Sequence, residues 1–215
     1  MKNILILVFI INLAFTQWEQ SNGTEGLDMQ AVISYEQSIY AGGATGTYKS
    51  NNEAENFILS NNGNDSNGPT RGFTYDDIYI YTCTSQGVFR SNNNGDSWVP
   101  KNNGLNNLLS HGIIRVGERL IHVGPGGVSM SENHGDNWSF IGMSGFDVRC
   151  VTNINDTLFI GTNGQGLYKS NNWGQNWIPI NNGSTSSTFR AIESKGNILF
   201  AGGQNGTGVF RSLDY

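Results

Sequence analysis

The sequence is poor in charged residues. Lysine and arginine number 12 against 17 aspartate and glutamate residues, the net charge is -5, and charged residues make up 13% of the 215 residues. This balance, without any basic run, excludes an electrostatic nucleic-acid binder, which has to neutralise phosphates. Disorder is also excluded, because disordered chains have few aromatic residues and aromatics reach 11% here.

Cysteine is scarce as well, with only Cys83 and Cys150 present. A single disulfide cannot stabilise a domain of this size in place of a hydrophobic core, so the chain does not belong to the small disulfide-rich domains. A bridge requires closely opposed Cβ atoms. We therefore expect two unpaired core residues, with a disulfide between them as the alternative.

Motifs of catalysis and metal binding are missing. The sequence has no H-E-x-x-H, G-x-x-x-x-G-K-[ST], G-x-S-x-G or C-x-x-C. Its three histidines, His111, His122 and His134, show no ligand spacing. The loop NNGNDSNGP at 61–69 lacks the acidic alternation of a calcium loop. We expect no metal, no cofactor and no assignable catalytic residue.

Apolar runs long enough to span a membrane are absent. The longest run, at 4–15, follows Lys2 and is interrupted by Asn12. Its length is typical of a secretory signal peptide, since a membrane span needs about 20 apolar residues. We expect a signal peptide at 1–16, an exported domain at 17–215 and no membrane attachment after cleavage. An uncleaved anchor is the alternative. Export predicts a secreted or cell-envelope protein of a bacterium.

What the chain does contain is repetition. SNNNGDSW at 91–98 recurs as SENHGDNW at 131–138, as SNNWGQNW at 170–177 and, degraded, as SNNEAENF at 50–57. The first residues of these copies and of a fifth, incomplete one are separated by 41, 40, 39 and 42 residues. They are Ser50, Ser91, Ser131, Ser170 and Ser212. This spacing is typical of the blades of a β-propeller.

The same pattern precedes each serine. An extended apolar segment and a glycine-containing turn lead into Gly-apolar-aromatic-basic-Ser, as at 156–170 and 197–212. Short runs of this kind between Gly and Asn clusters predict strands joined by tight turns. One further strand precedes these two strands, and another follows each tryptophan, so every unit supplies four strands. The predicted fold is an all-β propeller of four-stranded antiparallel blades.

The motif S-x-N-x-G-x-x-W resembles the Asp-box, or BNR, repeat of sialidase-like and photosystem assembly-factor-like exported propellers. In four copies asparagine replaces the acidic residue, and asparagine caps a tight turn much as aspartate does. The resemblance implies a peripheral turn between third and fourth strands, with its aromatic residue packed inward. The residues with this structural role are Ser91, Asn93, Gly95, Trp98, Ser131, Asn133, Gly135, Trp138, Ser170, Asn172, Gly174 and Trp177.

Trp18 suggests how the ring closes. It precedes Phe57 by 39 residues, in phase with the box aromatics, and WEQSNG at 18–23 matches 177–183 with one residue fewer. The chain thus begins with a fourth strand and ends, at Ser212, in a unit that lacks one. We expect these ends to pair and close a monomeric five-bladed ring, hiding two strand edges. The alternatives are a truncated array or pairing with another copy.

The resemblance also implies that ligands bind at one face, where the first strands of the blades begin. Several cationic side chains converging there could hold a carboxylate or phosphate. Alternatively, each arginine lies in solvent or pairs with a local acid such as Asp147 or Glu193. The candidate ligand residues are Arg71, His111, Arg149 and Arg190, with Gln30 in the remaining unit.

The catalytic set of a sialidase is not assignable. The best local cluster is Tyr75 before Asp76 and Asp77, for which a polar turn is the alternative explanation. We therefore expect an exported non-catalytic binding or scaffold protein that takes a protein or glycan ligand at the loop face around the central channel. A glycoside hydrolase of the sialidase-like Asp-box type is the alternative.

Overall fold

The computed structural model describes residues 18–64 and 68–215, and the regular structure of these residues is entirely β. The predicted signal peptide at 1–16 lies outside them. Within the described ranges, no helix has the length and apolar character needed to cross a membrane. Cys83 and Cys150 are both free thiols, and burial raises the pKa of each to about 12.

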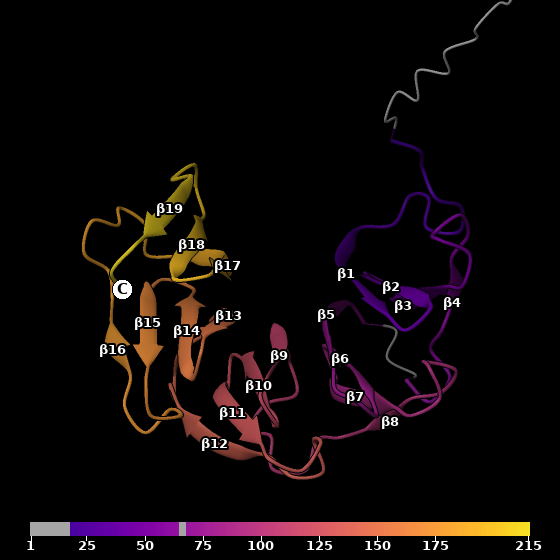
Figure 1. Cartoon of the computed structure of the whole chain (residues 1–215), viewed down its shortest axis with the longest axis horizontal. Helices are drawn as coiled ribbons and strands as arrows, with labels where there is room; N and C mark the ends of the chain where they lie inside the picture. The colour runs from indigo at the N-terminus through magenta and orange to yellow at the C-terminus, as the bar shows by residue number, and fades with distance from the viewer. Residues whose placement is uncertain (1–17, 65–67) are drawn as a thin grey trace, which may run out of the picture.

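Antiparallel sheets of four strands repeat four times, and a fifth sheet has three strands (Figure 1). We call them blades 1 to 5. This confirms the predicted all-β fold of repeated four-stranded blades. The strands are β1 (Met29–Tyr35), β2 (Ser38–Gly43), β3 (Gly46–Ser50) and β4 (Ile58–Leu59); β5 (Thr70–Tyr75), β6 (Ile80–Thr84), β7 (Gly87–Ser91) and β8 (Val99–Pro100); β9 (Gly112–Val116), β10 (Arg119–Gly124), β11 (Gly127–Ser131) and β12 (Ser139–Gly142); β13 (Val148–Ile154), β14 (Thr157–Thr162), β15 (Leu167–Ser170) and β16 (Ile178–Pro179); β17 (Phe189–Lys195), β18 (Ile198–Gly203) and β19 (Val209–Ser212).

The repeated turns at 50–57, 91–98, 131–138 and 170–177, which we call box turns, share one hydrogen-bond pattern. In the second, Ser91 Oγ accepts the Gly95 N–H at 2.9 Å and donates to Asn93 Oδ1 at 2.8 Å. Asn93 Oδ1 also accepts the Ser97 N–H at 3.0 Å. Asparagine therefore supplies the acceptor oxygen that a carboxylate would supply. The same bonds link Ser131, Asn133 and Gly135, and Ser170, Asn172 and Gly174.

Asn-Asn-Gly segments after the fourth strands join neighbouring blades. Asn102 Oδ1 accepts the Val88 N–H at 2.8 Å and so holds the hairpin between β6 and β7. Asn103 O accepts the Trp138 N–H of the next box turn at 2.8 Å. Gly104 follows with φ +92°, and a Cβ there would stand 2.1 Å from the Trp138 carbonyl oxygen. Only glycine lets the two backbones approach this closely.

The core lies between blades. Tyr40 of blade 1 packs with Ile80, Phe89 and Trp98 of blade 2, and Tyr81 of blade 2 packs in the cluster that holds Trp138 of blade 3. Trp98 and Trp138 are 2% and 5% exposed. Trp98 and Trp138 thus pack inward, against the blade before their own.

The blades form an open arc rather than a closed ring. The first strands line its inner side and pack in sequence, β1 on β5, β5 on β9, β9 on β13 and β13 on β17, while blades 1 and 5 face each other across the opening (Figure 1). Trp18 is 100% exposed, and the sheet that ends at Ser212 has three strands within the described residues. The predicted closure by Trp18 beside Ser212 was therefore wrong for this structure.

A physical reason accounts for this difference. The repeat phase fixes which strands can pair, but the angle between neighbouring blades is set by the side chains packed between them. Asn22, at the end of the expected closing strand, is held on blade 1 by bonds to Glu55 and Phe57.

Candidate functional site

The candidate ligand residues occupy one repeated backbone feature. The register between first and second strands shifts between Met29 and Ala31, Thr70 and Gly72, Val148 and Cys150, and Phe189 and Ala191. Such β-bulges redirect a side chain and are frequent beside functional sites. The residues inside these bulges are Gln30, Arg71, Arg149 and Arg190.

In blade 3 the corresponding residue is His111, just before β9. The His111 N–H donates to Val123 O at 2.8 Å. We call His111 and the four bulge residues the rim residues. The structure therefore places every sequence-predicted ligand residue at the same end of an inner strand.

His111 and Arg149 converge on Asp147, which directly precedes β13. His111 Nε2 lies 3.2 Å from Asp147 Oδ1, and an Arg149 N–H donates to Asp147 Oδ2. Asn163 Nδ2 donates to Asp147 Oδ2 at 3.1 Å. The His111 side chain is 8% exposed and that of Arg149 20%. The pairing with Asp147 is the local-acid alternative that the sequence left open.

The other two arginines bind local groups. Arg71 donates to Ser110 O at 3.4 Å, and Arg190 Nε donates to Gln204 Oε1 at 3.0 Å. Glu193, the other acid considered for such a role, instead accepts the N–H of Ser194.

Burial and positive charge together lower the pKa of His111 to about 4. Burial is the largest cause and Arg149 the next; Asp147 opposes them, and Arg71 and Arg190 add to the lowering. His111 is therefore neutral at pH 7. Because screening limits such effects to about 10 Å, the charges of all three arginines lie near enough to act on His111.

Three buried polar atoms of this cluster lack a well-aligned hydrogen bond within the described chain: Arg149 Nε, and His111 Nε2 and Asp147 Oδ1, which lie 3.2 Å from each other. Buried polar atoms are bonded in the large majority of cases, so exceptions mark strain or a position for a ligand or water. Three exceptions on adjoining side chains make this the best-defined candidate site.

Beneath the rim lies a second histidine that the sequence did not single out. His122 of β10 is buried, and its Nε2 lies 2.7 Å from Ser110 Oγ. Burial lowers its pKa to about 4, with a smaller effect from His111. The sequence of β10 gave no sign of this contact. His122 stands among the apolar residues of the strand, and its partner Ser110 lies in the loop before β9.

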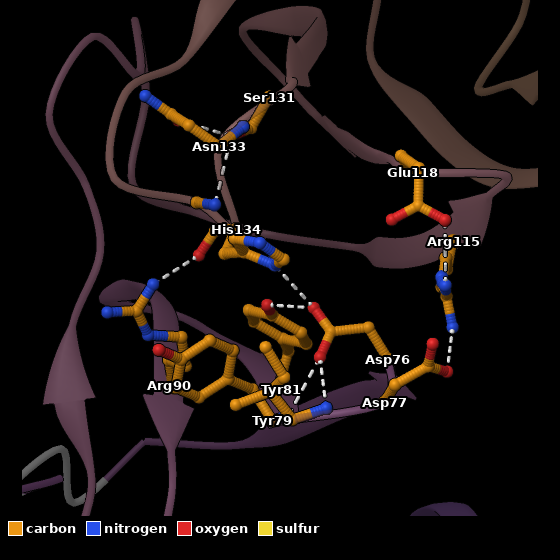
Figure 2. Close-up of polar contacts among 12 residues, drawn as sticks. Asp76, Asp77, Tyr79, Tyr81, Arg90, Arg115, Glu118, Ser131, Asn133 and His134 are labelled. Carbon is orange, nitrogen blue, oxygen red and sulfur yellow. Dashed lines mark hydrogen bonds and ion pairs between the residues drawn. The ribbon is translucent and has the colours of Figure 1, made fainter.

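The cluster around Asp76 has a structural role (Figure 2). Asp76 accepts the Ile78 and Tyr79 N–H groups at 2.9 and 2.8 Å and the Tyr81 hydroxyl at 2.5 Å. His134 Nδ1, in the third box turn, lies 2.8 Å from Asp76 Oδ2. Burial raises the pKa of Asp76, but the hydrogen bonds from Tyr81, His134 and the backbone outweigh it, so the pKa is lowered overall.

An acid held ionised by this many donors is poorly suited to protonate a leaving group. Asp77 is exposed and pairs with Arg115, while the Tyr75 ring contacts the Tyr35 ring at 5.1 Å. The polar-turn alternative therefore describes this segment. No group of His, Cys, Asp or Glu side chains in the described ranges has the arrangement of a metal site.

Solved structures identify the class of protein as a β-propeller. YCF48 bound to D1 peptide aligns with a TM-score of 0.67 at 15% identity, over 93% of this chain and 69% of that one. The extracellular domain of a one component system from B. thetaiotaomicron aligns with a TM-score of 0.66 at 16% identity, over 85% of this chain. A GH74 xyloglucanase from Xanthomonas campestris aligns with a TM-score of 0.65 at 16% identity, over 83% of this chain.

The chain spans only 26% of the length of that extracellular domain and 35% of that of the xyloglucanase. At these identities the likeness establishes the fold alone. A comparison of the sequence with protein-family models finds no match, and neither does one with curated proteins.

Proposed function

We propose that this chain is an exported, non-catalytic propeller that binds a carboxylate-bearing protein or glycan ligand at the rim of its inner strands. The observation that supports this most is the cluster of buried polar atoms on His111, Asp147 and Arg149: Arg149 Nε has no partner in the described chain, and His111 Nε2 and Asp147 Oδ1 have only each other, at 3.2 Å. The positive charges of Arg71 and Arg190 also act on His111. Export rests on the apolar segment within residues 1–16.

The chemistry of the rim favours an anion. Arg149 uses one terminal nitrogen for Asp147, while its Nε has no partner in the described chain. A guanidinium presents five donors in a fixed fork that matches a carboxylate. An incoming carboxylate would bind the remaining donors, and the uncharged His111 would add a hydrogen bond without adding charge.

Binding is favoured over hydrolysis by the state of the acids. Asp76 is bound by four donors and Asp147 by Arg149 and Asn163. A glycosidase needs a protonated acid and a second carboxylate about 5 to 10 Å away. Neither of these two acids has the environment of a general acid.

The test is binding to arrays of acidic and neutral glycans, and of peptides with free and amidated C termini. We expect the chain to retain carboxylate-bearing probes, and Arg149→Met to weaken this binding at least tenfold, in line with about 1.5–3 kcal/mol for a charged hydrogen bond. Arg119→Met, on β10 and paired with Glu132, is the matched control. Equal loss in both variants, or binding that ignores the carboxylate, would contradict the proposal.

A further inference from the structure

The two ends of the arc expose apolar surface that is covered between the other blades. On the last blade Val209 and Leu213 are 77% and 60% exposed, and on the first blade Val32 is 72% exposed. A strand edge with free backbone groups is a template for pairing with another chain.

Contacts to a box aromatic recur along the array. The Phe57 and Trp98 N–H groups donate to the carbonyls of Asn22 and Asn62 at 2.9 and 2.8 Å, as Trp138 does to Asn103. The indole N–H of Trp98 donates to Ser60 O at 2.8 Å. Trp138 and Trp177 bond in the same way to Lys101 O and Ile141 O.

A glycine completes three of these contacts. A Cβ at Gly23, Gly63 or Gly104 would lie 2.1 to 2.2 Å from the carbonyl oxygen of the facing aromatic residue. At the end of blade 4 the corresponding residue is Gly183, with φ +79°, and nothing lies within 4 Å of its Cβ position.

The residues that would receive an aromatic at this end line a pocket of about 360 Å³. Ile180 and Asn182 stand where Lys101 and Asn103 stand in the joint that receives Trp138. Leu199, Phe210 and Tyr215 supply apolar walls. The pocket thus offers the carbonyl groups, the glycine and the apolar surface that hold a tryptophan elsewhere in the fold.

The segment 18–23 has the matching form. Asn22 and Gly23 already make the contacts of an Asn-Gly pair to Phe57 on blade 1. Trp18 begins this segment, at the position of a box aromatic, and is 100% exposed. By its repeat phase the segment corresponds to the fourth strand of a blade, and within the described residues it pairs with no sheet and makes only an isolated bridge from Asn22 to Asn56.

Charged side chains at the two ends of the arc also favour a contact between these ends. The basic residue before a box serine pairs with an acid of the next box turn: Lys49 with Asp96 at 2.9 Å, and Arg90 with Asp136 at 3.2 Å. On the last blade Arg211 holds the basic position, and on the first Glu55 holds the acidic one; both are exposed.

We propose that the pocket of blade 5 receives the segment 18–23 of a second copy of this chain, with Arg211 paired to that copy's Glu55. Within one chain the two surfaces face each other across the opening of the arc (Figure 1), so joining them would require the arc to close. A second copy requires no such change. The contact is head-to-tail, which leads to a large ring or a filament.

Sedimentation velocity over a concentration series tests this. We expect the 215-residue chain to associate, and Trp18→Ala and Gly183→Ala each to raise the dissociation constant at least tenfold. Gly145→Ala is the matched control, because Gly145 also has φ +79° and open space around its Cβ. Its association should equal that of the unaltered chain.

Mixing distinguishes a second copy from closure within one chain. The Trp18→Ala chain keeps the pocket and the Gly183→Ala chain keeps the tryptophan, so an equimolar mixture should form a one-to-one dimer that neither forms alone. A monomeric unaltered chain, association that survives both substitutions, or a mixture that stays monomeric would each overturn the proposal.

Discussion

At the residue scale, the box turns depend on backbone conformation as much as on hydrogen bonds. Two successive residues in each turn have positive φ: 54° at Asn94 and 76° at Gly95 in the second copy. The degraded first copy keeps this conformation with Glu53 at 57° and Ala54 at 68°. A residue with a Cβ is strained there, at a cost of about 1–2 kcal/mol.

The strain at Ala54 leads to a prediction. Ala54→Gly should raise the free energy of unfolding by up to about 1 kcal/mol, because relief of the strain exceeds the extra backbone entropy of glycine, about 0.4–1 kcal/mol. Urea denaturation measures this. The reverse change, Gly95→Ala, should destabilise the chain, since its Cβ would also stand 2.6 Å from Tyr40 Cε1. A less stable Ala54→Gly variant would contradict the prediction.

At the element scale, the sequence predicted the strands and box turns well because both follow local rules. Alternating apolar residues and Gly or Asn at turns decide a hairpin within a few residues. The Asn-Asn-Gly segments were used only to align repeats, and their contacts were not predicted. Asn102 and Asn103 bind groups from two different blades, so no local pattern reveals what they contact.

The box aromatics allow a graded test of the joint between blades. Trp138→Ala should cost about 3–5 kcal/mol of stability, as for other large-to-small core substitutions. Trp138→Phe should cost much less, keeping most of the buried ring but losing the bond to Lys101 O, worth about 1 kcal/mol. Blade 1 already uses Phe57 at this position. Equal costs in urea denaturation would show that the ring does not anchor the joint.

At the scale of the whole molecule, the candidate site was predictable only in part. Aligned repeats placed the rim residues correctly on the inner strands, because strand starts follow the period. The partner Asp147 and an array that does not close were foreseen only as alternatives, and the Ser110 contact of His122 was not predicted. These depend on loop paths and on packing between blades, which no single repeat specifies.

An array whose units touch only their neighbours should be least stable at its ends. We expect amide hydrogens of β1 and of β17 to β19 to exchange at least tenfold faster than those of β6 and β10, whose residues are almost all buried. Hydrogen exchange with mass spectrometry, at a concentration where the chain is monomeric, measures this. Uniform protection would contradict the expectation.

The contact between an Asn-Asn-Gly segment and the next box turn consists of backbone bonds, the bond of the indole N–H and a side-chain bond of the second asparagine, from Asn62 to Asp96 O and from Asn103 to Asn137. The backbone part of this contact is the same whichever two units it connects. Gain or loss of a unit of about forty residues by unequal recombination would therefore restore these backbone bonds at the new joint, while the side chains packed there would differ. The number of blades can change in one genetic event. Because each unit carries one rim residue, the number of rim residues changes with it.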